Sequence, residues 1–114
     1  MIAVIFEVLP TEAGREHYLE LATQLRESLL QMPGFISIER FQSLSDPGKL
    51  LSLSFWEDEA AVARWRALGE HRAAQSAGRS GLFADYRIRV GHVVRDYSLD
   101  DRAQSPADSR AAHP

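Results

Sequence analysis

Four side chains that could do chemistry lie close together in the second half of one predicted helix, residues 58–78: Trp65, His71, Arg72 and Gln75. At roughly 100° per residue, Arg72 lies within about 20° of Trp65 on the helix surface, and His71 and Gln75 border the same stripe. An indole wall, an imidazole that can accept a proton and a guanidinium that can stabilise an anion suit a pocket for an ionisable substrate.

Each of these residues also has an ordinary structural explanation. A Trp at helical spacing usually packs in the core, and a histidine at the edge of a stripe is usually a surface residue. The stem of Arg72 can pack while its head reaches water or a carboxylate. Gly69 costs about 1 kcal/mol relative to Ala inside a helix, so it makes room for a ligand or for a close strand. The sequence is therefore compatible with two interpretations of this helix face, a ligand pocket and a packed core.

Patterns for metals and resident cofactors are missing from the sequence. The chain has no Cys, which excludes a disulfide framework, a thiol nucleophile and thiolate metal sites. It has no pair of histidines at i,i+4, no GxGxxG and no P-loop. We therefore expect no metal site and no cofactor. The chemistry would then depend on the reactivity of the substrate itself. The alternative is haem, which brings its own reactivity.

Composition narrows the class of protein. The 114 residues are 45% hydrophobic, which is typical of one globular domain. The net charge is −3 with no basic block, so nucleic-acid binding is not expected. No apolar run approaches the ~20 residues of a membrane span, and the first ten residues do not resemble a signal peptide. With no Cys, we expect a cytoplasmic protein that does not associate with membranes.

The periodicity of apolar residues predicts four strands and two helices in the order β-α-β-β-α-β. This order is the split βαβ arrangement of the α+β ferredoxin-like fold, with a four-stranded antiparallel sheet and both helices on one face. The expected strands are 2–9, 35–42, 50–57 and 82–97, the expected helices are 11–32 (capped by Thr11) and 58–78 (capped by Asp58), and these form a domain over 1–97 followed by a polar tail over 98–114.

The sheet face without helices is expected to be partly apolar. In the strand 50–57, alternation predicts that Leu51, Leu53 and Phe55 point toward the helices and that Trp56 points away with the serines. Exposed apolar area of this kind usually marks an interface, so we expect a homodimer, sheet against sheet, with the tail reaching across the partner. The residues expected on this face are Ile5, Phe41, Trp56 and Val93.

Three segments in order carry a resemblance to a known family: "LPTEAGREHYLELATQL", "MPGFISIERFQS" and "LLSLSFWEDEAAVARWR". Together they resemble the antibiotic biosynthesis monooxygenase superfamily, whose members are dimeric α+β barrels. The later segments "EHRAAQSAGRSGLFADYRIRVGHVVRDY" and "DDRAQSPADSRAAH" resemble its haem-degrading-monooxygenase-like branch.

The resemblance implies one of two chemistries. Some members oxidise polyketide-like phenols with O₂ and no cofactor, because the deprotonated substrate itself gives an electron to oxygen. Others bind haem through a histidine and open its ring. A helix Trp lines the pocket in both kinds, and Trp65 matches it; His71 is the only candidate haem ligand. The chain contains no Asn, so the Asn used by haem degraders has no counterpart.

We therefore predict a cofactor-independent monooxygenase that oxidises a small aromatic or polyketide-like substrate with O₂. The alternatives are a haem-degrading monooxygenase and a non-catalytic dimeric module that binds small molecules. Trp65 and His71 are the catalytic candidates, in a cavity between the second helix and the sheet. The substrate-binding candidates are Phe6, Arg72, Gln75, Phe83 and Tyr86.

Overall fold

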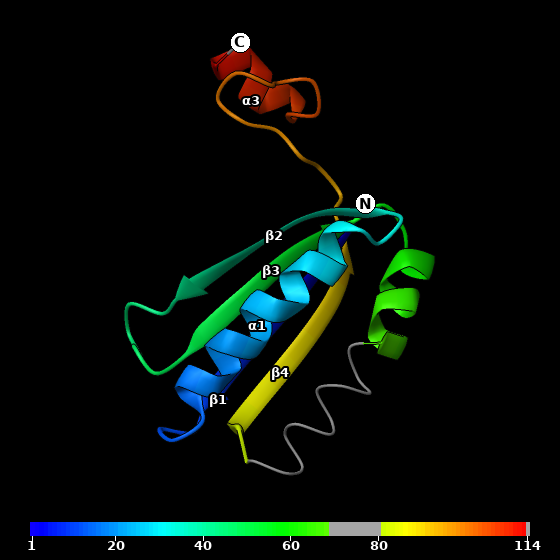
Figure 1. The fold of residues 1–114 in the computed structure, drawn as a ribbon. Coiled ribbons are helices and arrows are strands. Elements are labelled where there is room, and N and C mark those ends of the chain that lie inside the picture. Colours follow the sequence, from blue (N-terminus) through cyan, green and yellow to red (C-terminus); the bar gives the residue numbers. More distant parts are fainter. Residues whose placement is uncertain (69–80, 114) are drawn as a thin grey trace.

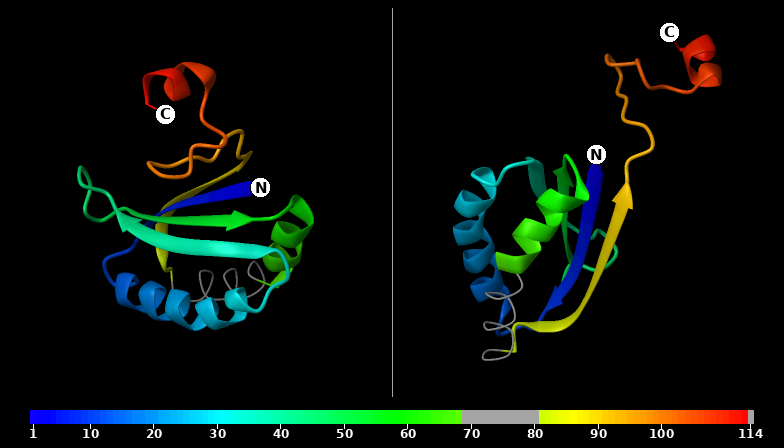
Figure 2. Two further views of the ribbon diagram at one scale, coloured as in Figure 1. Left: turned by 90° about the horizontal axis from the view of Figure 1, so that it is seen from above. Right: turned by 90° about the vertical axis from the view of Figure 1, so that its right-hand side faces the viewer.

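The computed structural model describes residues 1–68 and 81–113 and shows one antiparallel sheet with helices on one of its faces (Figures 1 and 2). The strand order in the sheet is β2-β3-β1-β4. This confirms the predicted ferredoxin-like α+β fold. The strands are β1 (Ile2–Pro10), β2 (Phe35–Gln42), β3 (Leu50–Trp56) and β4 (Phe83–His92), and the helices are α1 (Arg15–Leu30), a second helix described over residues 59–68, and α3 (Ala107–Ala112).

The predicted ends of two elements were wrong. β4 ends at His92 and not at residue 97, because His92 already pairs with Ile2, the first residue of β1. Beyond this pair, the Val93 N–H donates a hydrogen bond to the Met1 carbonyl at 3.0 Å. Without a neighbouring strand, the residues after 93 have no ladder to join.

α1 begins at Arg15, later than predicted, and Thr11 does not cap it. The Thr11 hydroxyl instead accepts a hydrogen bond from the Gly14 N–H at 3.0 Å and donates one to the Gly81 carbonyl at 2.9 Å. It therefore ties the turn before α1 to the segment that enters β4. The second helix is capped as predicted, since an Asp58 carboxylate oxygen accepts from the Ala61 N–H at 2.8 Å.

The predicted orientation of β3 was also wrong. Trp56 faces the helices and is only 1% exposed, and Ser52 and Ser54 share its face. Leu51 and Leu53 consequently lie on the face without helices. Strand register explains the reversal, because Trp56 pairs with Ile2, another fully buried residue, and the Trp56 indole N–H donates to the Ser54 hydroxyl at 2.9 Å. The buried Ser54 hydroxyl and the Trp56 indole N–H therefore pair with each other, and neither of these two polar groups is left without a hydrogen bond.

A register shift at the start of β2 changes the face of Phe35. The strand pairs Phe35 with Trp56 but then Ser37 with Phe55, so Ile36 is an extra residue on β2 without a partner on β3. Strict alternation along the strand would put Phe35 on the face of Ser37, but Phe35 packs edge-on against the Trp56 ring, with ring centroids 5.3 Å apart. Such bulges re-aim side chains locally, and this one adds an aromatic ring to the core.

The buried side chains form two separate clusters on the helix-covered face. One gathers around Trp56 and includes Ile2 and Leu29, with Trp65 packed against it. The other joins Val8, Tyr18 and Leu50, with Phe6 and Phe83 packed against it. The two clusters lie at opposite ends of the sheet, because Ile2 and Val8 are near opposite ends of β1.

The C-terminal segment leaves the sheet and projects away from it (Figures 1 and 2). Its contacts are largely internal: the Arg102 guanidinium lies 5.3 Å from the centre of the Tyr97 ring and donates to the Ser109 hydroxyl at 2.7 Å. Leu99 is 90% exposed. Arg102 is thus occupied within its own segment, and packing of the tail on a partner stays a prediction.

Gly34, in the turn between α1 and β2, supplies the first testable prediction. Its φ is +84°, and an added Cβ would lie 2.7 Å from the Cβ of Ala61. Gly34→Ala should lower the free energy of unfolding by at least about 2 kcal/mol, since a left-handed backbone is strained for Ala and the clash adds to it. Denaturant titration of both proteins measures the change.

Gly48→Ala is the matched control, because an added Cβ there would meet only ordinary contacts, the nearest at 3.4 Å. Equal stability losses in the two variants would contradict this explanation.

Candidate functional site

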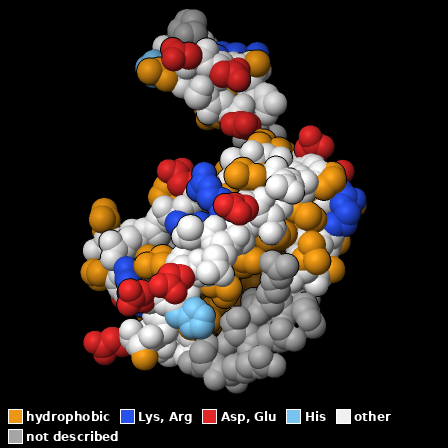
Figure 3. Space-filling model, viewed as in Figure 1, with side chains coloured by type: hydrophobic (Ala, Val, Ile, Leu, Met, Phe, Trp, Pro, Cys, Tyr) orange, Lys and Arg blue, Asp and Glu red, His pale blue; other side chains and the backbone are white. Residues whose placement is uncertain are grey.

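A cavity of about 290 Å³ lies between α1, the second helix and the sheet. Its wall is almost wholly apolar, and residues of both core clusters contribute to it. The space-filling view shows hydrophobic side chains gathered beside α1 on this face (Figure 3). The volume is near the lower end of the ~300–1,000 Å³ range of small-molecule sites. The cavity therefore suits a small, largely apolar ligand.

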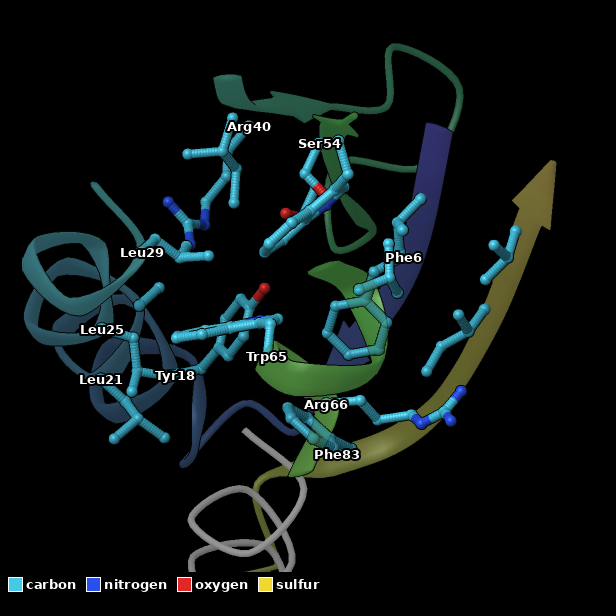
Figure 4. A pocket seen from close by; sticks show the side chains of 18 residues that line it. Phe6, Tyr18, Leu21, Leu25, Leu29, Arg40, Ser54, Trp65, Arg66 and Phe83 are labelled. Carbon is cyan, nitrogen blue, oxygen red and sulfur yellow. The ribbon is translucent and has the colours of Figure 1, made fainter. Parts of the chain in front are cut away.

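Three of the predicted site residues line this cavity: Phe6, Trp65 and Phe83. Figure 4 shows their rings directed into it from β1, the second helix and the start of β4. Phe6 and Phe83 meet edge to face with centroids 6.0 Å apart. Tyr86 contacts the Phe6 ring at 6.0 Å but is 59% exposed and lies outside the cavity wall.

The other predicted site residues fall outside the described residues. These are His71, Arg72 and Gln75, together with the helix position Gly69. Their roles stay predictions.

Trp65 lies between core and cavity. Its ring centroid is 6.4 Å from that of Trp56, and it packs against the Trp56 cluster while it also lines the cavity. Core packing and a pocket wall were the two interpretations of Trp65 from the sequence. In the structure its indole does both, since it packs against the core and lines the cavity.

Two polar residues of the wall were missed in the sequence: Arg40 on β2 and Tyr18 on α1. Figure 4 shows the Arg40 side chain reaching from β2 toward α1, and the Tyr18 hydroxyl pointing into the cavity. Alternation carried a signal for Arg40, since it follows Ile38 by two residues on the face toward the helices. Tyr18 is a buried residue of α1, and spacing cannot distinguish a Tyr that lines a cavity from one that only packs in the core.

The pKa of the Tyr18 phenol is raised above its usual value by burial. The positive charge of Arg40 acts in the opposite direction but is the smaller effect. Because the phenol keeps its proton at neutral pH, it can donate a hydrogen bond to a ligand. The cavity thus holds a cation and a hydroxyl donor near each other in an otherwise apolar wall.

Two serines of β3 also belong to the wall, Ser52 and Ser54. Ser52 pairs across the sheet with Arg40 on one side and with Phe6 on the other. The serine hydroxyls are small, so this row of the sheet leaves space beside Arg40 where larger residues would fill it.

The described part of the chain offers no histidine to this cavity and no group of three or more potential metal ligands. His17, His92 and His113 are all exposed. These three histidines do not form a site that ligates haem iron. Among the described helices, none is both long and apolar enough to cross a bilayer.

Comparison with known proteins identifies the family to which this chain belongs. The family model for antibiotic biosynthesis monooxygenases matches residues 1–77. This chain belongs to the antibiotic biosynthesis monooxygenase family.

Relatives of the family support the assignment. The chain is 48% identical over 94 residues to the jasmonate monooxygenase ABM of Pyricularia oryzae, a match that covers 82% of this chain but 44% of that protein. The chain thus spans less than half the length of this relative. It is 32% identical over 93 residues to the uncharacterized protein YqjZ of Bacillus subtilis, over 82% of this chain and 79% of that one.

Solved structures of the family share the fold. One is a crystal structure from Deinococcus radiodurans, attributed to an antibiotic biosynthesis monooxygenase. It matches with a TM-score of 0.75 at 18% identity and covers 86% of this chain and 97% of that one.

The position of Trp65 generates the second prediction, a comparison of the two tryptophans. Trp56→Ala should lower the free energy of unfolding by about 3–5 kcal/mol, because it empties a fully buried site. Trp65→Ala should cost clearly less, because one side of this indole already faces the cavity. Thermal and denaturant unfolding of both variants measures the difference, and equal losses would assign Trp65 to the core alone.

Proposed function

We propose that this chain is a monooxygenase that oxidises a small apolar substrate with O₂ inside the cavity lined by Trp65. The observation that carries this proposal is the largely apolar cavity in a chain of the monooxygenase family. O₂ is itself apolar, and a wall of this kind excludes water from reactive intermediates.

The chemistry needs no cofactor when the substrate supplies the electrons. A CH₂ group that is acidified by neighbouring carbonyl or aryl groups loses a proton, and the resulting carbanion gives electrons to O₂. One oxygen atom becomes the new carbonyl oxygen of the substrate, and the other leaves as water with the two hydrogens of the CH₂ group. Arg40 and the Tyr18 hydroxyl would bind a polar or anionic group of the substrate, and the rings of Phe6, Trp65 and Phe83 would hold its flat body.

Two substrate classes fit this proposal. The first is an aromatic or polyketide-like compound, which the aromatic lining favours. The second is a jasmonate-like compound, since the relative from Pyricularia oryzae is named for jasmonate. Both combine an apolar body with a carbonyl or hydroxyl group.

The test is oxygen uptake by the purified chain with an anthrone and with jasmonate, without and with added reductant. Incorporation of one atom from isotopically labelled O₂ identifies a monooxygenase, and turnover without a reductant identifies the cofactor-independent route. Hemin is added in a parallel sample, and haem-dependent turnover would replace this proposal by haem chemistry. Ligand binding without any oxygen uptake would favour a non-catalytic binding module.

Ala22 on α1 offers a variant that fills the cavity, because it is 5% exposed and lines the wall. Ala22→Leu should lower turnover at least about tenfold while the free energy of unfolding changes by less than about 1 kcal/mol, since the new side chain enters empty space. Ala60→Leu, at an exposed position of the second helix, is the control and should leave turnover unchanged. Full activity of Ala22→Leu would place the reaction elsewhere.

We also propose that the sheet face without helices binds a second copy of this chain. The face carries Ile5, Leu51, Leu53 and Phe55 in its centre. Glu7 on this face is already paired with Lys49 at 3.1 Å and Arg89 at 3.2 Å, and mainly its hydrogen bond to Lys49 lowers its pKa. The charges near the apolar centre are therefore largely neutralised within one protomer.

Symmetry also favours a second copy. A two-fold axis parallel to the strands would set β2 of one protomer over β4 of the other. Glu39 of β2 lies level with Arg89 of β4 across the sheet and would then approach the partner's Arg89, so the two edges are complementary in charge.

Light scattering after size exclusion should give close to twice the monomer mass. Leu53→Glu should shift the protein to monomers, since a charge at the centre of an apolar interface is not compensated. Leu19→Glu makes the same change on α1, where the leucine is 40% exposed, and should leave the mass unchanged. A native monomer at micromolar concentration would exclude the sheet-to-sheet dimer.

A further inference from the structure

Arg40 is the unusual residue of the cavity. It projects from β2 into a wall that is otherwise formed by side chains such as Leu25, Leu29 and Ile38. Its Nε is buried and has no hydrogen-bond partner. Buried polar nitrogens are paired in most proteins, and an unpaired one calls for an explanation.

No carboxylate of the described residues pairs with this charge. Among the described residues, the ion pairs are those of Glu7 with Lys49 and Arg89, on the opposite face of the sheet. Arg40 is half-buried, so part of its guanidinium is shielded from water, and an anion in the cavity would give this charge a partner. The side chain is therefore arranged as one half of an ion pair whose other half does not come from the described part of the chain.

The shape of the guanidinium indicates the anion. Its planar fork of N–H groups matches the two oxygens of a carboxylate, and such pairs form two parallel hydrogen bonds. The Tyr18 hydroxyl points into the same cavity, and both the positive charge of Arg40 and a hydrogen bond from its side chain act on this hydroxyl. Because this phenol keeps its proton, it can donate a further hydrogen bond to a carboxylate oxygen.

The rest of the wall defines the body of the ligand. Away from Arg40, Tyr18 and the serines, the side chains are aliphatic or aromatic, apart from Arg66 at the side of Phe83 and β4 (Figure 4). The cavity of about 290 Å³ has room for a short apolar skeleton. A ligand with one charged end and an apolar body therefore fits the polarity of this wall.

We propose that Arg40 and Tyr18 form a carboxylate anchor, and that the substrate of this cavity is a small apolar monocarboxylic acid. This inference rests on the proposed function, because it takes the cavity as the substrate site. The anchor holds the carboxylate at the β2 side, so the apolar body extends along Phe6 and Trp65. Arg40 here is a binding residue that selects the substrate.

Calorimetric titration of the full chain with 3-cyclopentylpropionate and with its methyl ester tests the anchor. The two probes share one apolar body and differ in charge. The acid should bind roughly 10- to 100-fold more tightly than the ester, which is the range for charge-assisted hydrogen bonds. The acid's affinity should fall as the pH drops below about 5, where carboxyl groups take up a proton.

Arg40→Met should remove this preference by weakening the acid about 10- to 100-fold while leaving the ester unchanged, since it keeps much of the stem and deletes the charge. Arg40→Lys should lose part of the preference, because an ammonium group lacks the fork. Tyr18→Phe should weaken the acid by a smaller factor. Arg26→Met, at an exposed position of α1, is the matched control and should leave both affinities unchanged.

Equal affinities of acid and ester in the native protein would overturn the anchor, and so would failure of the acid to bind. An equal loss for acid and ester in Arg40→Met would show that Arg40 only packs. Binding of the acid that depends on Arg40, without oxygen uptake for any carboxylic acid, would retain the anchor and remove the proposed monooxygenase. If the protein oxidises neutral compounds but does not prefer the acid, the proposed monooxygenase would be retained and the anchor removed.

Discussion

Trp56 is buried at the end of β3, where it packs against Ile2, Leu29 and the second helix, and its orientation decides what every other side chain of that strand faces. Because side chains alternate along a strand, one buried indole assigns Ser52 and Ser54 to the helix-covered face. The same alternation assigns the leucines and Phe55 to the free face. The cavity wall and the proposed dimer face thus follow from a single packing choice.

The cavity exists because the two core clusters do not merge. Large rings fill both ends of the space under the helices, around Trp56 at one end and around Phe83 and Tyr18 at the other. Between them, the sheet contributes serines and α1 contributes Ala22, which are too small to fill the gap. Close packing is the rule in protein interiors, so a gap of this size between two well-packed ends indicates a site for a ligand.

Polar groups in this gap are placed where an apolar core would not need them. Arg40 could have reached solvent from the opposite face of β2 if it stood one position earlier or later. Its position beside Ile38 instead brings a cation into contact with the wall. The low polarity of that wall strengthens any ion pair formed there and makes the absence of a partner costly. Affinity and selectivity for an anion would therefore arise from the same feature.

Much of the fold was determined by the sequence by itself. The alternating runs, the helical stripe of α1, the cap at Asp58 and the turn at Gly34 are local signals, and they were sufficient for the order of elements. The family was indicated by the resemblance of three segments to its known members. The placement of Phe6, Trp65 and Phe83 around a cavity also followed from patterns along single elements.

Only the tertiary structure decided which face of β3 is covered. Both of its faces carry large apolar side chains, so alternation predicts two faces without saying which one the helices cover. The bulge at Phe35, the early end of β4 and the role of Thr11 likewise depend on contacts with residues distant in the sequence. Arg40 and Tyr18 come together from a strand and a helix whose spacing gives no sign of the other. Their nearness is set by how α1 lies across the sheet, because a site formed between elements depends on packing and not on local pattern.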